Sequence, residues 1–226
     1  MKAIILAAGI GSRLGKPHPK PLTELTTGET IMQRQISALS KYIGKDNIII
    51  VVGFKKDLIM EKFPDQMYIY NNIYDNTNTS KSLLCALNKI YDEDVLWLNG
   101  DVVFDEKVLE PIIDFNGSCM AVNTSSVAEE EVKYNINQDG SIRKVSKIII
   151  DGLGEAVGIN KIAQNHLELL KESLQNCEPQ DYFERGLEFS IEKGLKLFPL
   201  DVSNHLCIEV DFNEDLESVN NRLSEN

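Results

Sequence analysis

The sequence lacks several features that would define other classes of protein. It has no run of about 18 apolar residues, so we expect no transmembrane helix and no membrane partner. An apolar segment follows Lys2 directly, which leaves no room for a signal peptide and predicts a cytoplasmic protein. The four cysteines form no CxxC pair and no metal-ligand spacing with histidine, which is typical of reduced thiols. There is also no Ser/His/Asp or Cys/His arrangement for covalent catalysis.

Positive charge is scarce as well. The chain of 226 residues carries 23 Lys and Arg residues against 35 Asp and Glu residues, a formal net charge of −12. Such an acidic chain is a poor match for nucleic acid, which binds to an electropositive face. Its length and 42% hydrophobic content suffice for one sizeable core, and it contains no repeat, linker or low-complexity segment. We therefore expect a single domain over residues 1–226, either a monomer or a homodimer.

A glycine-rich loop near the N-terminus is the most informative feature that is present. An apolar run at 3–8 is followed by Gly9, Gly11, Arg13 and Lys20. A buried strand that breaks into such a loop can bind phosphates, because glycines let backbone N–H groups approach an anion and basic side chains neutralise it. The loop matches neither the P-loop pattern nor the dinucleotide fingerprint. The prolines of segment 16–21 also exclude the helix that a dinucleotide-binding turn needs.

Along the rest of the chain, apolar runs alternate with helical patterns, which predicts βαβ units. Strands are expected at 3–8, 47–52, 67–70, 94–98, 119–124, 132–136, 142–147 with an extension at 148–150, 155–160, 195–201 and 208–210. Helices are expected at 30–41, 56–62, 81–90, 164–176, 181–193 and 213–223, the last capped by Asn213. The pattern predicts an α/β protein, a Rossmann-like three-layer α/β/α sandwich. Its sheet should be mixed and mostly parallel, with a β-hairpin lid from about 132 to 150.

Segment 6–14, Leu-Ala-Ala-Gly-x-Gly-Ser-Arg-Leu, is followed by a Pro-Lys pair ending at Lys20. It resembles the signature of the nucleotidyltransferases that make nucleotide-activated sugars and alcohols. The resemblance implies the nucleotide-diphospho-sugar transferase fold, with a nucleotide-binding part at about 1–115 and an acceptor-binding part at about 116–226. It also implies that Arg13 and Lys20 bind the phosphates of a nucleoside triphosphate. The stretch between them is shorter than in many sugar nucleotidyltransferases, so Lys16 is a further candidate, whereas His18 fits a solvated loop residue.

Two carboxylates follow apolar runs. Asp101 ends an Asn-Gly-Asp turn, and Asp211 lies between a short apolar run and a predicted helix. Ligands of open α/β sheets bind at the carboxyl ends of strands, and Mg²⁺ takes a few carboxylates together with phosphate oxygens. The resemblance implies that Asp101 and Asp211 hold the metal and that Arg13, Lys20 and Asp101 serve catalysis. Glu209 is expected to point to the opposite face of its strand.

Segment 70–83 is rich in amides and hydroxyls and resembles the choline-phosphate cytidylyltransferase branch of the family. A Gly-Glu-x-x-Gly-Ile segment at 154–159 resembles the family's acceptor contact, and 182–184 could close the same pocket around an ammonium group. Phe183, Trp97, His166 and His205 fit structural roles, and 129–131 fits a solvated strand entry. The expected nucleotide-binding residues are Leu6, Ala7, Ala8, Gly9, Gly11, Ser12, Arg13, Lys20, Gly53, Asn71, Asn78, Thr79, Ser82, Asn99 and Gly100. The expected acceptor-binding residues are Tyr74, Lys133, Lys147, Glu155, Tyr182 and Glu184, with the phosphate contact open between the two lysines.

The reaction that this resemblance implies is Mg²⁺-dependent nucleotidyl transfer. A phosphate oxygen of an acceptor attacks the α-phosphorus of a nucleoside triphosphate, and pyrophosphate leaves. The cytidylyltransferase branch implies CTP and a small phosphorylated acceptor such as phosphocholine, phosphoglutamine or aminoethylphosphonate. The alternatives are a sugar-1-phosphate with UTP or dTTP, and a nucleotide-binding regulatory module without catalysis. In each case the expected partners are small molecules.

Overall fold

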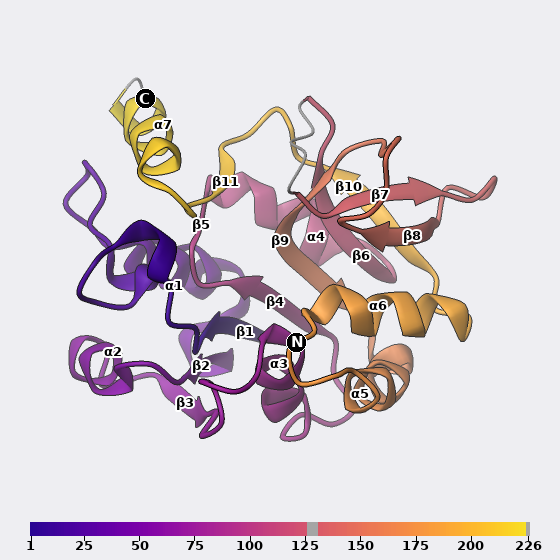
Figure 1. Ribbon diagram of the computed structural model, residues 1–226, viewed down its shortest axis with the longest axis horizontal. Coiled ribbons are helices and arrows are strands. Elements are labelled where there is room, and N and C mark those ends of the chain that lie inside the picture. Colours follow the sequence, from indigo (N-terminus) through magenta and orange to yellow (C-terminus); the bar gives the residue numbers. More distant parts are fainter. Residues whose placement is uncertain (126–130, 225–226) are drawn as a thin grey trace.

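The computed structural model describes residues 1–125 and 131–224 and has a twisted sheet between layers of helices (Figure 1). The main sheet has the strand order β10-β6-β9-β4-β1-β2-β3. Strand β9 runs antiparallel to β4 and β6, and the other neighbouring pairs on this path are parallel. These strands are β1 (Lys2–Ala7), β2 (Ile48–Val52), β3 (Met67–Tyr70), β4 (Val95–Asn99), β6 (Ser118–Asn123), β9 (Glu155–Ile162) and β10 (Leu197–Asp201).

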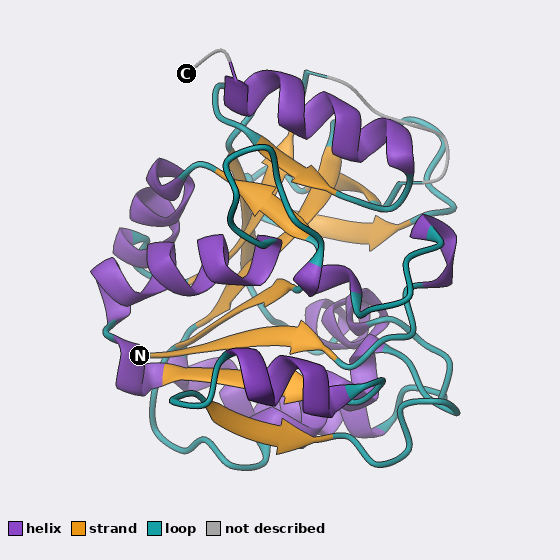
Figure 2. Cartoon of the chain, turned by 90° about the vertical axis from the view of Figure 1, so that its left-hand side faces the viewer, coloured by secondary structure: helices purple, strands orange, loops and turns teal. Residues whose placement is uncertain are grey.

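Helices lie on both sides of the sheet (Figure 2), because its central strands are apolar on both faces. Ile4 and Leu6 of β1 pack in one core with α3 (Thr79–Leu87), α5 (Leu167–Gln175) and α6 (Phe183–Glu192). Ala3 and Ile5 pack in a second core with α1 (Ile31–Ile43), α2 (Lys56–Lys62) and α4 (Leu109–Asp114). Strand β2 is buried throughout its Ile-Ile-Ile-Val-Val run, as expected for a parallel strand between two helical layers. The three-layer sandwich with a mixed sheet is confirmed.

The remaining elements are a hairpin, a small sheet, helix α7 and short 3₁₀ turns. Strands β7 (Lys133–Ile136) and β8 (Ile142–Ser146) form the predicted hairpin, and β5 (Val102–Phe104) pairs with β11 (Cys207–Glu209) in a small antiparallel sheet. Helix α7 (Asn213–Ser224) packs on a third core that includes Leu14, Val210 and Val219. This core joins the N-terminal loop to the end of β11. The 3₁₀ turns are η1 (Ser12–Leu14), η2 (Lys20–Leu22), η3 (Lys45–Asn47), η4 (Glu106–Val108) and η5 (Gln164–His166).

Three local expectations were wrong. Strand β8 ends at Ser146, and segment 148–150 is a turn in which Ile148 is 77% exposed. The helix expected at 164–176 begins as a 3₁₀ turn and becomes α-helical only at Leu167. Asn213 is the first residue of α7 and does not cap it. Instead, the Asp215 carboxylate accepts hydrogen bonds from the backbone N–H groups of residues 211 and 212.

All four cysteines are free thiols. Within residues 1–125 and 131–224, no helix combines the length and the apolar character needed to cross a bilayer.

Candidate active site

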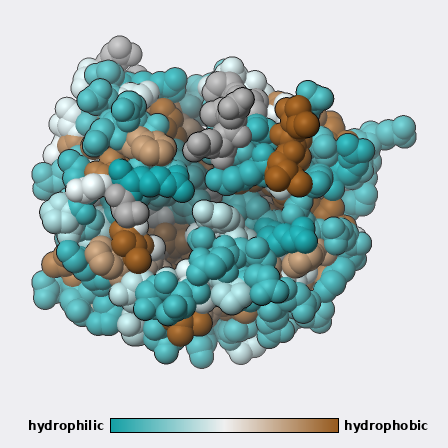
Figure 3. All heavy atoms as spheres, in the orientation of Figure 1, coloured by the Kyte–Doolittle hydropathy of each residue, from teal (hydrophilic) through white to brown (hydrophobic). Residues whose placement is uncertain are grey.

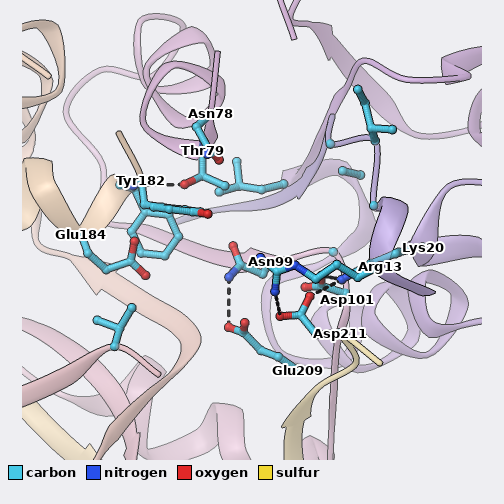
Figure 4. A pocket seen from close by; sticks show the side chains of 18 of the residues that line it. Arg13, Lys20, Asn78, Thr79, Asn99, Asp101, Tyr182, Glu184, Glu209 and Asp211 are labelled. Carbon is cyan, nitrogen blue, oxygen red and sulfur yellow. Dashed lines mark hydrogen bonds and ion pairs between the residues drawn. The ribbon is translucent and has the colours of Figure 1, made fainter. Parts of the chain in front are cut away.

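A cavity of about 460 Å³ opens at the carboxyl ends of β1 and β4 (Figure 4). Leu6 and Ala7 line it from β1, and Asn99, Gly100 and Asp101 line it from β4 and the turn that follows. Its other walls come from segments 9–21, 74–79, 131–132, 147, 156, 180–184 and 209–212. Because β1 and β4 are parallel neighbours, the loops that follow them lie at the same edge of the sheet.

The N-terminal loop carries the basic groups of this cavity. The turns η1 and η2 hold Arg13 and Lys20 at the cavity wall. The aliphatic stem of Lys20 lies against Gly11, where a Cβ would come within 2.7 Å of Lys20 Cγ. Lys20 is 8% exposed, so the loop buries the stem while the ammonium reaches the cavity.

The ammonium of Lys20 lies between two carboxylates. Its Nζ donates to Asp101 Oδ2 at 3.1 Å and also to Asp211 Oδ1, and Arg13 Nη1 donates to Asp211 Oδ2 at 2.8 Å. Figure 4 shows these four side chains converging in one group. Burial lowers the pKa of Lys20, but the charges and hydrogen bonds of the two carboxylates outweigh this and raise it above its usual value. Burial raises the pKa of Asp101, which Lys20 opposes.

The donors in this group fit a magnesium ion brought in with a triphosphate. Asp101 and Asp211 direct carboxylate oxygens toward the same point, which the Lys20 ammonium now takes. No cluster of three or more His, Cys, Asp or Glu ligands is found in the described part of the chain. Two carboxylates nevertheless suit Mg²⁺, which usually combines one or two of them with water and phosphate oxygens. The pair therefore fits a shared metal and nucleotide site.

Glu209 lies on the cavity side, so the expectation that it faces away was wrong. Its carboxylate accepts a hydrogen bond from Asn99 Nδ2 at 3.0 Å, and Asn99 Oδ1 is buried without a hydrogen-bond partner in the described structure. Burial, with the nearby charge of Asp101, raises the pKa of Glu209 well above its usual value. The sequence did contain the signal, since Glu209 and Asp211 are two residues apart and residues at this spacing share a face of a strand.

The segment before α3 and the start of α6 meet at the opposite wall. Asn78 caps α3 by accepting the Thr79 N–H, and Thr79 Oγ1 accepts the backbone N–H of Phe183 at 3.0 Å. Tyr74, Asn78 and Thr79, which the sequence predicts to bind the nucleotide or the acceptor, all line the cavity, and Gln180 lines it as well. These hydroxyl and amide groups provide donors and acceptors within reach of a bound molecule.

The first turn of α6 and the end of the hairpin form an acidic wall. This wall is lined by Tyr182, Glu184, Lys147 and Glu131. The Lys147 ammonium lies 5.4 Å from the centre of the Tyr182 ring. Burial raises the pKa of Glu184 to about 7. Glu131 is half-buried and lines the cavity, so it does not form the fully solvated strand entry that was expected; residues 129 and 130 lie outside the described residues. Burial, followed by the charge of Glu155, raises the pKa of Glu131. Phe183 is 1% exposed and packs edge-on against Trp97, as a core residue should.

Several predicted contact residues lie outside the lining of the cavity. Asn71 is fully buried. Its side-chain amide donates to Ser82 Oγ of α3 and accepts from the Ile73 N–H. Lys133 of β7 and Glu155 of β9 are paired where the hairpin joins the main sheet. The side chain of Ser12 lies outside the described structure, and its backbone belongs to η1. The predicted residues outside the cavity lining are Ala8, Gly53, Asn71, Ser82, Lys133 and Glu155, together with Lys16 and His18.

The basic glycine-rich loop, the paired carboxylates and the three-layer fold are the features that the resemblance to the nucleotidyltransferases predicted. A model of the MobA-like NTP transferase domain matches residues 3–136, more than half of the chain. The chain belongs to this family of nucleotidyltransferases.

Among curated proteins, the chain is similar to cytidylyltransferases and to the bifunctional protein GlmU. It is 27% identical to the CTP:phosphoglutamine cytidylyltransferase of Campylobacter jejuni, covering 96% of this chain and 98% of that protein. It is 29% identical to the bifunctional protein GlmU of Methanococcus maripaludis, covering 99% of this chain and 54% of that protein. The chain thus spans about half the length of this longer relative.

Solved structures show the same fold at low sequence identity. The CTP:phosphocholine cytidylyltransferase of Streptococcus pneumoniae superposes with a TM-score of 0.80 at 20% identity, covering 98% of each chain. A nucleoside-diphosphate-sugar pyrophosphorylase from Vibrio cholerae superposes with a TM-score of 0.77 at 15% identity, covering 96% of this chain and 99% of that one. The predicted nucleotide-diphospho-sugar transferase fold is therefore confirmed.

Proposed function

We propose that this chain is a Mg²⁺-dependent cytidylyltransferase. A phosphate oxygen of a small phosphorylated acceptor attacks the α-phosphorus of CTP, the bond between that phosphorus and the bridging oxygen breaks, and pyrophosphate leaves. The products are a CDP-linked compound and pyrophosphate. The observation that carries the proposal is the group formed by Arg13, Lys20, Asp101 and Asp211 in one cavity. It combines phosphate-binding cations with metal-binding carboxylates.

The chain's own residues act by positioning and by charge neutralisation. Lys20 and Arg13 exchange their carboxylate partners for the phosphates of the nucleotide and hold the departing pyrophosphate. Asp101 and Asp211, once released from Lys20, would hold the metal, which would neutralise charge at the α-phosphate. Glu209 and Asn99 support the same wall through their hydrogen bond. In this scheme the part at about 1–115 binds the nucleotide and the part at about 116–226 binds the acceptor, apart from Asp211.

One relative supports CTP as the nucleotide. The match covers nearly the whole length of both chains, and the relative's name pairs CTP with phosphoglutamine. An acidic acceptor wall supports an acceptor with a positively charged nitrogen. Glu184 and Glu131 contribute the carboxylates of that wall, and Lys147 contributes a cation for the acceptor phosphate. An acceptor with both charges would match both kinds of side chain.

A sugar-1-phosphate nucleotidyltransferase using UTP or dTTP is the second candidate, because a nucleoside-diphosphate-sugar pyrophosphorylase shares the fold. Pyrophosphate release separates the candidates when each of CTP, UTP, dTTP, ATP and GTP is paired with each acceptor and Mg²⁺. The acceptors are phosphocholine, phosphoethanolamine, phosphoglutamine, aminoethylphosphonate and glucose-1-phosphate. Release with CTP and an amino acceptor supports the proposal. Release only with UTP or dTTP and glucose-1-phosphate supports the second candidate, and no release with any pair favours a binding module.

A further inference from the structure

We propose that the acceptor carries a nitrogen with at least one N–H, and that Glu184 accepts a hydrogen bond from it. A quaternary ammonium, which has no N–H, is then a poor acceptor. This inference rests on the proposed function and narrows the acceptor class of the same site.

The first observation is a carboxylate oxygen in the acidic wall that has no hydrogen-bond partner in the described structure. Glu184 lies in the first turn of α6 and lines the cavity, where Figure 4 shows its carboxylate beside Tyr182. Its Oε2 atom is buried and has no hydrogen-bond partner in the described structure. Buried polar atoms are almost always paired, because an unpaired one loses its hydration without replacement. A ligand that donates a hydrogen bond would provide the missing partner.

The second observation concerns Lys147, the basic side chain that contributes to this wall. Its ammonium lies over the Tyr182 ring, and no hydrogen bond or ion pair joins it to Glu184 within the described residues. The residue nevertheless lowers the pKa of Glu184 through its charge, so it lies close enough to interact electrostatically. Lys147 therefore leaves the carboxylate available for a second cationic group while remaining near the acceptor.

The third observation is that the two aromatic rings next to Glu184 in the sequence, those of Tyr182 and Phe183, already have packing partners. Quaternary ammonium groups are bound chiefly by the faces of aromatic rings. One ring beside Glu184, that of Tyr182, already has Lys147 over its face. The other ring, that of Phe183, is 1% exposed and packs on Trp97. The wall thus offers a hydrogen-bond acceptor rather than an open aromatic cage.

The face of the molecule seen in Figure 3 is mostly hydrophilic, and its apolar side chains form separate small groups.

The test is a series of acceptors that differ only in methylation: phosphoethanolamine and its N-methyl, N,N-dimethyl and N,N,N-trimethyl forms, the last being phosphocholine. Each is assayed with CTP and Mg²⁺ for kcat/KM by pyrophosphate release. The first three forms keep an N–H at neutral pH, so we expect kcat/KM to fall by at least about tenfold at the final methylation, the loss expected for a hydrogen bond to a charged group. A gradual decline over all steps would indicate size selection and overturn the inference, as would equal or higher kcat/KM for phosphocholine.

The substitution Glu184→Gln assigns the effect to this side chain. We expect the ratio of kcat/KM for the dimethyl form to that for phosphocholine to fall by at least about fivefold, because the neutral amide attracts the N–H less strongly. Glu192→Gln, on an exposed position of the same helix and outside the cavity lining, should leave the ratio unchanged. An unchanged ratio in Glu184→Gln overturns the inference. Failure of all four acceptors with CTP overturns the inference, whereas the proposed function falls only when phosphoglutamine and aminoethylphosphonate also fail with CTP.

Discussion

Gly158 leaves the space that the Glu209 carboxylate fills. A Cβ on Gly158 would lie 2.2 Å from Glu209 Oε1, closer than any real contact, and the residue has φ of +70°. Glu209 in turn accepts the hydrogen bond from Asn99, the last residue of the central strand β4 and the neighbour of the turn that carries Asp101. A glycine in one strand thus decides where a carboxylate of another strand lies.

We predict that Gly158→Ala lowers kcat/KM by about tenfold or more, because the new methyl group displaces Glu209 and breaks its contact with Asn99. The left-handed backbone adds a stability cost of about 1–2 kcal/mol. Activity with the best acceptor and the midpoint of thermal unfolding are the two measurements.

Gly140→Ala is the matched control for Gly158→Ala. Gly140 has φ of +81° and open space where its Cβ would be. It should therefore lose stability without losing kcat/KM. Equal losses of activity in the two variants, or full activity of Gly158→Ala, would contradict the steric argument.

Much of the fold could be predicted from the sequence, because long apolar runs and helical periodicity are strong local signals. The run at 48–52 is a buried parallel strand for this reason. That the glycine-rich loop, Asp101 and Asp211 lie together at one edge of the sheet was also predictable, since a motif fixes residue types at the ends of strands. Loop side chains were less predictable, because their direction depends on tertiary partners. Asn71 illustrates this, since its side-chain amide forms hydrogen bonds with Ser82 and the Ile73 N–H and does not line the cavity.

The carboxylate of Asp101 should be essential for turnover but dispensable for folding. We predict that Asp101→Ala lowers kcat by at least about 100-fold, because a metal ligand and a partner of Lys20 are lost together. Lys20 keeps its second partner, Asp211, so the buried ammonium stays paired and the fold survives. Circular dichroism and pyrophosphate release measure the two effects. Asp57→Asn, at an exposed carboxylate on α2, is the control; retained activity in Asp101→Ala would remove the metal assignment.

Asp215 should act on Asp211 through the backbone. One oxygen of its carboxylate accepts the N–H of Asp211 at 3.0 Å and that of Phe212 at 2.7 Å. Asp215→Ala frees both N–H groups, which costs about 0.5–2 kcal/mol for a lost cap and lets Asp211 move. We predict a rise of about threefold or more in the Mg²⁺ concentration needed for half-maximal activity.

Asp215→Asn separates positioning from general loss of stability, because its amide oxygen can accept the same two N–H groups. It should restore the Mg²⁺ dependence to within about twofold of the original. If Asp215→Ala loses stability but needs no more Mg²⁺, then Asp215 serves only the helix and has no part in positioning Asp211.

Glu184 should reduce stability as the pH rises. Burial raises its pKa in the folded protein from 4.5 to about 7, whereas the unfolded carboxyl titrates near the unperturbed value. Between these values the folded state binds more protons than the unfolded state, so the free energy of unfolding falls with rising pH and the full penalty is present above about pH 7. Glu184→Gln removes this titration. We therefore compare the unfolding free energy of Glu184→Gln with that of the original protein. We predict that the variant's value minus the original protein's value increases by about 1–3 kcal/mol between about pH 5 and pH 8.

For a chain of this length, each kcal/mol corresponds to about 2–4 °C in the unfolding midpoint. The comparison across pH cancels any constant cost of placing an amide at position 184. Glu192→Gln, exposed on the same helix, should show no change in its difference from the original protein over this range. A difference for Glu184→Gln that stays flat or shrinks with rising pH would mean that the carboxylate is not penalised by burial.

The same measurement repeated with phosphoethanolamine should give a smaller difference in unfolding free energy between Glu184→Gln and the original protein at the higher pH, because a bound ammonium stabilises the ionised form of Glu184.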